Sequence, residues 1–187
     1  MSDVIAALNR DHANIAKLLA LLESEILAIE VGKTPDYPLL QDIMCYMIEY
    51  PGRFHHPKEN LIFTQVLKRN PGARADIEAL LEEHNSIDLA GRNFDRILRT
   101  SNIDSVTVRQ RLGTAGFAYI RTLREHISIE ENKLFPLAEA VITKEDWHEI
   151  EETIDTLEDP LFGPEHSKRY ERLYRLITDR IESGALT

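Results

Sequence analysis

Two pairs of residues in this chain combine an imidazole with a carboxylate at the same spacing. Glu59 follows His55 by four residues, and Glu130 follows His126 by four residues. On a helix, this spacing places the two side chains of each pair one turn apart on the same face. Imidazole nitrogens and carboxylate oxygens both bind transition metals, so each pair could hold part of a metal cluster.

Two single histidines interrupt apolar stripes elsewhere in the chain. His12 stands between Leu8 and Ile15, and His84 stands four residues after Leu80. Burying such a polar group without a partner costs about 2–7 kcal/mol, so something must compensate. We therefore predict that six side chains converge on two metal ions, which supply that compensation. The predicted ligands are His12, His55, Glu59, His84, His126 and Glu130.

The types of the predicted ligands favour iron, and manganese and zinc remain possible. Carboxylates can bridge two cations, while the imidazoles complete the shell and leave open positions for an exogenous molecule. The alternative interpretation is a structural module whose histidines are hydrogen-bonded core residues. One inward histidine on each of four helices, with two matching glutamates, favours the metal site. A haem slot is disfavoured because the chain has no Cys-x-x-Cys-His motif.

The elements that must position these ligands are four helices, indicated by apolar residues at steps of three and four. They are expected to run from Ile5 to near Gly32, from Leu40 to Val66, from Ile77 to Leu98, and from Leu112 to between Pro136 and Ile142. Pro51 and Pro57 each remove a backbone donor from the second helix. We therefore expect that helix to be irregular between Tyr50 and Lys58. Short linkers favour an all-α, up-down-up-down four-helix bundle.

The bundle is predicted to occupy residues 1–142, and a C-terminal helical extension occupies residues 143–187. Two helices are expected in the extension, from an N-cap at Thr143 to about Leu157 and from Glu165 to about Ser183. The loop at residues 159–164 separates them. Apolar side chains such as Trp147 give the extension a surface to pack on the bundle. Its role is left open among covering a bundle end, regulating access and forming a homodimer.

Length and charge narrow the possible functions. The chain has 187 residues, which favours one well-buried core. Its formal net charge of -10 repels phosphate backbones and anionic lipid, so nucleic acid and membrane surfaces are poor partners. Cys45 is the one cysteine, which fits a reducing compartment. With no signal peptide and no long apolar run, the predicted location is the cytoplasm.

Four stretches of the sequence resemble the hemerythrin-like family of HHE cation-binding domains. They are Asp11-His12, FHHPKENLIF from Phe54 to Phe63, Glu83-His84, and HISIEENKLFP from His126 to Pro136. The resemblance covers roughly residues 1–140. It implies an antiparallel four-helix bundle with an oxo- or carboxylate-bridged di-iron site. Members of the family handle oxygen, nitric oxide or peroxide, or supply iron, and all six predicted ligands match the family pattern.

The chain departs from the oxygen-carrying members of that family at two positions. Those members have a second histidine four residues before the equivalent of His84, where this chain has Leu80. The chain also has an extra histidine, His56, which is either a seventh ligand or a group that orients a ligand or faces water. The first departure argues against an oxygen carrier.

Two metal-dependent functions therefore remain open. The first is a di-iron protein that binds or senses a small molecule such as O2 or NO. The alternative is a di-iron redox enzyme that decomposes peroxide, or a protein that supplies iron to damaged iron-sulfur clusters. Whether the chain is an enzyme is left undecided.

Overall fold

The computed structural model describes residues 2–100, 105–154, 159–164 and 167–182, and within these ranges it contains helices, turns and loops but no strand. The α-helices are α1 (Asp3–Glu30), α2 (Tyr37–Tyr50), α3 (His56–Arg69), α4 (Arg74–Thr100), α5 (Val106–Ile129), α6 (Phe135–Val141), α7 (Lys144–Thr153) and α8 (Glu171–Glu182). Two π-helical turns, η1 (Pro51–His55) and η3 (Glu130–Leu134), and a 3-10 turn, η2 (Pro71–Ala73), join some of them.

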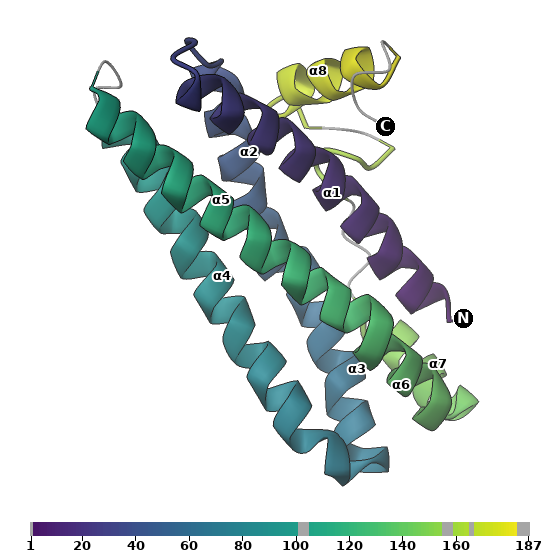
Figure 1. Cartoon of the computed structure of the whole chain (residues 1–187). Helices are drawn as coiled ribbons and strands as arrows, with labels where there is room; N and C mark the ends of the chain where they lie inside the picture. The colour runs from purple at the N-terminus through teal and green to yellow at the C-terminus, as the bar shows by residue number, and fades with distance from the viewer. Residues whose placement is uncertain (1, 101–104, 155–158, 165–166, 183–187) are drawn as a thin grey trace.

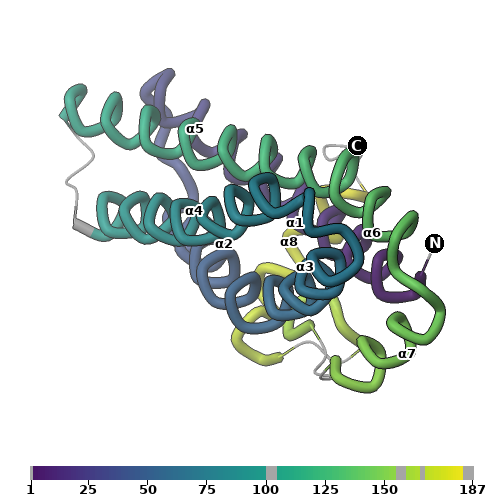
Figure 2. Tube along the Cα trace, turned by 90° about the horizontal axis from the view of Figure 1, so that it is seen from below, coloured from purple at the N-terminus to yellow at the C-terminus, as the bar shows by residue number. Residues whose placement is uncertain are grey.

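Four rods make up a bundle, as the sequence predicted. The rods are α1, the α2–η1–α3 segment, α4, and the α5–η3–α6 segment (Figures 1 and 2). Each rod packs against the next one along the chain, and α5 closes the ring by packing against α1. This arrangement is an all-α, up-down-up-down bundle, in which side chains from every rod can meet in one core.

Local signals account for the limits of the first rod. The Ser2 hydroxyl accepts a hydrogen bond from the backbone amide of Ile5 and caps the start of α1. Beyond its end, Gly32 adopts a φ of 77°, a left-handed conformation that glycine tolerates best. The predicted end near Gly32 is therefore confirmed. Asp36 then caps α2 by accepting a hydrogen bond of 2.9 Å from the amide of Leu39.

The expected irregularity of the second rod is confirmed as the π-turn η1. The amide of His56 bonds to the carbonyl of Pro51, five residues back. Pro57 explains this, because it lacks the N–H that would continue the α-helical ladder from η1. The wide turn holds an extra residue, so the inward-facing stripe slips by one position.

A second π-turn, η3, interrupts the fourth rod, where we expected a continuous helix. The amide of Phe135 bonds to the carbonyl of Glu130. Pro136 is the second residue of α6, just as Pro57 is the second residue of α3. The same loss of a proline N–H therefore accompanies the widened turn beside both predicted glutamate ligands.

The core of the bundle is divided into two apolar clusters by a polar layer. On α1, Leu8 belongs to one cluster and Ile15 to the other. On α4, Leu80 and Ile87 are divided in the same way. In all four rods the residues that lie between the clusters along the chain are the predicted metal ligands. The interruption therefore falls at one level of the bundle, where the polar side chains can meet.

Gly116 lets three helices approach closely at one end of the bundle. A Cβ added to this residue of α5 would collide with the side chain of Ile26 on α1 and would lie 3.0 Å from a ring carbon of Phe94 on α4. Only glycine fits this contact without movement of a neighbour.

The extension packs on the bundle at two places. Thr143 caps α7 as predicted, in a reciprocal capping box with Asp146. Asp146 also accepts hydrogen bonds from Gln65 and Arg69 of α3. Further along, Leu173 and Ile177 of α8 are buried in the same apolar cluster as α2.

The second helix of the extension starts later than we expected. It begins at Glu171 rather than Glu165, because residues 167–170 form a turn in which the amide of Tyr170 bonds to the carbonyl of Ser167. Residues 155–158 and 165–166, and residue 183, where the predicted helices start or end, lie outside the described residues. The division of the chain at residues 142 and 143 stays a prediction.

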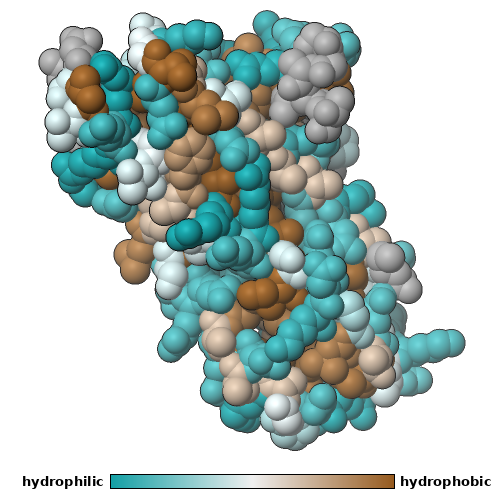
Figure 3. Space-filling view, viewed as in Figure 1, coloured by the Kyte–Doolittle hydropathy of each residue, from teal (hydrophilic) through white to brown (hydrophobic). Residues whose placement is uncertain are grey.

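The face of the molecule seen in Figure 3 is largely hydrophilic, with separate apolar patches. None of the helices in the described part of the chain has the length and apolar character needed to cross a bilayer.

Candidate metal centre

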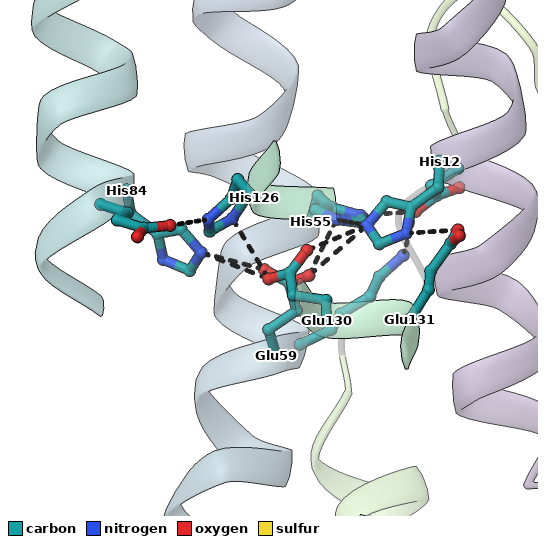
Figure 4. Close-up of polar contacts among 10 residues, drawn as sticks. His12, His55, Glu59, His84, His126, Glu130 and Glu131 are labelled. Atoms are coloured by element: carbon teal, nitrogen blue, oxygen red, sulfur yellow. Dashed lines mark hydrogen bonds and ion pairs between the residues drawn. The ribbon is translucent and has the colours of Figure 1, made fainter. Parts of the chain in front are cut away.

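The six residues predicted as ligands meet in the polar layer at the middle of the bundle. All six are buried, and Glu59 and Glu130 have no exposed surface. Figure 4 shows the two carboxylates between His12 and His55 on one side and His84 and His126 on the other. The side chains come from all four rods. The predicted convergence is therefore present in the structure.

On one side of the carboxylates, the Nε2 atoms of His12 and His55 lie 3.0 Å apart. The Nε2 atom of His55 lies 3.0 Å from Oε1 of Glu59, and that of His12 lies 3.3 Å from Oε2 of Glu130. Donors that share one ion at bond lengths of about 2.0–2.2 Å lie roughly 3 Å apart. The spacing on this side fits a shared cation.

On the other side, the remaining oxygens of the same two carboxylates face His84 and His126. Oε1 of Glu130 lies 3.2 Å from Nε2 of His126, and Oε2 of Glu59 lies 3.4 Å from Nε2 of His84. Each glutamate therefore directs one oxygen to each histidine pair. This is the arrangement expected of carboxylates that bridge two cations.

Six of these buried polar atoms have no hydrogen-bond partner among the described residues. They are both carboxylate oxygens of Glu59, both carboxylate oxygens of Glu130, and the Nε2 atoms of His84 and His126. The histidine–glutamate distances fall within the range of ion pairs, but these atoms are not aligned as donors and acceptors. Leaving a buried polar group unsatisfied costs about 1–3 kcal/mol, and more for a charged group. Cations placed among the atoms would satisfy all of them, so the donor set fits a metal cluster.

Three outer carboxylates contact the other ring nitrogen of three of the histidines. The contacts join Nδ1 of His12 to Glu131 at 3.0 Å, Nδ1 of His55 to Asp11 at 3.2 Å, and Nδ1 of His126 to Glu83 at 3.0 Å. An ionised carboxylate only accepts, so each contact places a proton on Nδ1 and directs Nε2 into the layer, where it can bind a cation that displaces any proton from it.

Sequence reasoning missed these outer carboxylates, although their positions contained a signal. Asp11 directly precedes His12, and Glu83 directly precedes His84. Each therefore lies at the level of the ligand layer but on an adjacent part of the helix surface. From there it contacts a histidine of a neighbouring rod instead of its own neighbour in sequence.

The charge of the carboxylates dominates the titration of the buried histidines. Burial lowers the pKa of His12, but the nearby carboxylates of Glu130 and Glu59 outweigh it and raise the pKa to about 9. Burial also lowers the pKa of His55, but the charge of Glu59 and a hydrogen bond to Asp11 outweigh it and raise the pKa to about 10. These imidazoles therefore hold protons that balance the carboxylates.

The carboxylates respond in the opposite sense. Burial raises the pKa of Glu59, but the charge of His55 outweighs this effect and lowers the pKa to about 2. Burial raises the pKa of Glu130, but the adjacent imidazoles of His12 and His126 outweigh this effect and hold the pKa well below its usual range. The layer thus retains two carboxylate charges, and a cation that binds there replaces protons on the imidazoles.

His56 lies beside the cluster with its ring stacked on that of His84. The ring centroids are 3.8 Å apart and the planes differ by 4°. Its nitrogen nevertheless lies within 4.8 Å of donor atoms of His84 and His126. Imidazole lone pairs lie in the ring plane, so two parallel, stacked rings do not direct them at one ion. Burial and the charge of His84 lower the pKa of His56 to about 3, which keeps its ring neutral.

Two cavities adjoin the cluster. A small cavity of about 10 Å³ is lined by side chains that include His12, His126 and Tyr119. A larger cleft of about 600 Å³ lies between the second rod and α4, and His56 and His84 line it. The larger cleft brings the outer surface of the bundle close to the histidine pair on one side of the carboxylates.

Comparison with known proteins supports the same conclusion as the geometry. The model of the family described as hemerythrin HHE cation-binding domain matches residues 3–138, which include the first three rods, most of the fourth and all six converging residues. No curated protein matches the chain closely enough to be compared with it. Because the match spans most of the chain, the protein belongs to the hemerythrin HHE cation-binding family.

Proposed function

We propose that this protein holds two iron ions and uses them to bind or sense a small molecule such as O2 or NO. The proposed ligands are His12, His55, Glu59, His84, His126 and Glu130. The observation that carries the proposal is the pair of buried, unpartnered carboxylates, each with one oxygen facing each histidine pair. Such a site supplies reversible electron transfer and open coordination positions when iron is bound.

The surrounding residues keep the donors in place for this role. Asp11, Glu83 and Glu131 hold the Nδ1 protons of three histidines and fix the orientation of the rings. The two apolar clusters on either side of the layer surround it with hydrophobic side chains. The low polarity of these surroundings strengthens the attraction between the carboxylates and any bound cation.

The cavities support a very small ligand. A volume of about 10 Å³ corresponds to roughly one water-sized probe, so the small cavity suits a diatomic molecule better than an organic substrate. The larger cleft offers a route from solvent to His84. We propose that His56 lines this route and packs against the face of His84, rather than serving as a seventh ligand.

Anaerobic loading with ferrous iron tests the proposal. Elemental analysis is expected to show two iron ions per chain, and optical spectra are expected to change on exposure to O2 or NO. Glu130→Gln preserves the size of the side chain but removes its charge, and should lower the iron content below two. His148→Gln is the matched control, because His148 is exposed on α7 and pairs only with its neighbour Glu152 among the interactions described here. Full iron loading of the Glu130 variant would contradict the proposal.

A redox enzyme that consumes peroxide is the second candidate. It is favoured by one specific observation: two stacked, buried tyrosines lie on α2, and burial with the charge of Asp11, the hydrogen-bond partner of His55, raises the pKa of Tyr50. Turnover of peroxide by the iron-loaded protein, compared with the same protein stripped of iron, distinguishes this function from ligand binding alone.

A further inference from the structure

Two buried tyrosines connect the neighbourhood of the metal centre with the C-terminal extension. The rings of Tyr46 and Tyr50, one turn apart on α2, are stacked with centroids 4.9 Å apart and planes that differ by 10°. Tyr46 is fully buried and Tyr50 is 2% exposed. On the side of the extension, the ring of Tyr170 meets Tyr46 edge-on at 5.6 Å.

Carboxylates lie at both ends of this pair. The hydroxyl of Tyr46 donates a 2.8 Å hydrogen bond to Oδ2 of Asp159, which belongs to the extension. Burial, with the negative charges of Asp11 and Asp159, raises the pKa of Tyr50, whose ring stacks on that of Tyr46. Asp11 in turn accepts a hydrogen bond from Nδ1 of His55. The stacked tyrosines therefore lie between a carboxylate of the extension and the carboxylate that contacts a proposed ligand.

From these contacts we propose that Tyr46 and Tyr50 form a redox relay that carries electrons from a donor at the extension to the oxidised metal centre. The inference rests on the metal site proposed above and names peroxide as the oxidant.

The surroundings of Tyr46 suit this chemistry. Burial, with the negative charge of Asp159, raises the pKa of Tyr46 far above its ordinary range, so the phenol stays protonated at neutral pH. A buried neutral phenol that loses an electron must also lose its proton, because a charged phenol radical is costly in an apolar core. The existing hydrogen bond to Asp159 provides the acceptor for that proton.

Electrons and protons balance in the proposed relay. For each electron withdrawn, the O–H bond of Tyr46 breaks, its proton moves to Oδ2 of Asp159, and the electron passes through Tyr50 toward His55. One hydrogen peroxide takes up two such electrons and two protons from solvent, and leaves as two waters. A one-electron donor of the thiol or ascorbate class then reduces each tyrosyl radical, and Asp159 returns the proton.

A purely structural role for the tyrosines predicts different behaviour. If the hydroxyls served only to pack the extension, Tyr46→Phe would change stability, but neither the wild type nor the variant would form a tyrosyl radical. A relay instead predicts a neutral tyrosyl radical when peroxide is added without a donor. The radical can be identified by electron paramagnetic resonance, because incorporation of ring-deuterated tyrosine narrows its signal.

The test uses the full chain, loaded with iron and assayed for iron content, then mixed with hydrogen peroxide and frozen rapidly. We expect a tyrosyl signal in the wild type, loss of the signal in Tyr46→Phe, and a diminished signal in Asp159→Asn. Asparagine keeps an oxygen acceptor for the amide of Leu161 but is a poor proton acceptor. Tyr174→Phe is the comparison variant, since Tyr174 is a half-buried tyrosine of α8 that lies outside the relay and outside the cavity at the cluster. It should retain the signal.

Two results would overturn the relay while leaving the metal site intact. They are the absence of any radical in fully iron-loaded wild type, and a radical that is lost in Tyr174→Phe but kept in Tyr46→Phe. If the chain bound no iron, the proposed function would fail, and the relay would be tested in the metal-free protein. Azide radicals generated by pulse radiolysis oxidise tyrosine directly, and the long-lived tyrosyl absorption should disappear in Tyr46→Phe. If the tyrosyl absorption decayed at the same rate in Tyr46→Phe as in the wild type, this result alone would refute the relay.

Discussion

Replacing the outer carboxylates one at a time measures how strongly they hold the histidines. Asp11→Asn and Glu83→Gln preserve side-chain size and an oxygen acceptor, but they remove the charge that faces the Nδ1 protons of His55 and His126. A charge-assisted hydrogen bond is about twice as strong as a neutral one, so both variants should bind metal more weakly.

The expected loss differs between the two positions because their exposure differs. Removing a partner of this kind typically costs about 10–100-fold in metal affinity, or roughly 1.4–2.7 kcal/mol. The side chain of Asp11 is 13% exposed, whereas that of Glu83 is 39% exposed. Solvent screening weakens the more exposed contact. We therefore expect a loss near 100-fold for Asp11→Asn and near 10-fold for Glu83→Gln.

Competition with a chromophoric chelator for ferrous iron, under anaerobic conditions, gives these affinities directly. Glu82→Gln is the matched control, because Glu82 precedes Glu83 on α4 but is exposed. Circular dichroism establishes that each variant remains helical. The reasoning is refuted if both outer variants bind iron as tightly as the wild type. It is also refuted if the control weakens binding as much as they do.

Three other predictions concern stability. Iron should raise the midpoint of thermal unfolding, measured by calorimetry, because it binds only the folded chain. The rise should be lost in Glu130→Gln, and equal midpoints of the wild type with and without iron would contradict this prediction. Gly116→Val should cost about 1–3 kcal/mol in urea unfolding, since its side chain would collide with two packed helices. Gly52→Ala is its control, because nothing lies within 4 Å of an added Cβ, and equal stability of the two variants would be the contrary result. A hydrogen bond from Arg69 of α3 holds the pKa of Asp146 below its ordinary value of 3.8. This contact should therefore stabilise α7 fully above pH 3.8, and its contribution should be lost progressively as the pH falls below that value. Fluorescence of Trp147 follows that transition, and an identical acid response in Asp146→Asn would exclude the carboxylate as its cause.

The sequence alone was sufficient to predict four helical rods and the six side chains that converge between them. Steps of three and four residues decide which side chains share a face of a helix, and that relation is local. His12 and His84 therefore stood out as polar residues on apolar stripes, and the bundle followed from four such stripes. Pro51 and Pro57 similarly predicted the irregularity of the second rod, because the missing N–H of a proline removes a hydrogen bond from the turn in which it stands.

Other local features were visible in the sequence but were not recognised. Pro136 lies beyond Glu130 as Pro57 lies beyond Pro51, yet only the structure showed that the fourth rod widens into η3. The later start of α8 at Glu171 follows the turn that the Tyr170 amide closes on the Ser167 carbonyl, and Tyr170 is buried in an apolar cluster of the bundle.

Only the tertiary structure decided how the side chains meet across helices. It showed that each carboxylate of Glu59 and Glu130 faces both histidine pairs, and that His56 stacks on His84. It also brought Asp159 to Tyr46, 113 positions earlier in the chain. The physical reason is that helical periodicity determines the direction of a side chain relative to its own axis. The distance and rotation between axes depend on how all the rods pack together.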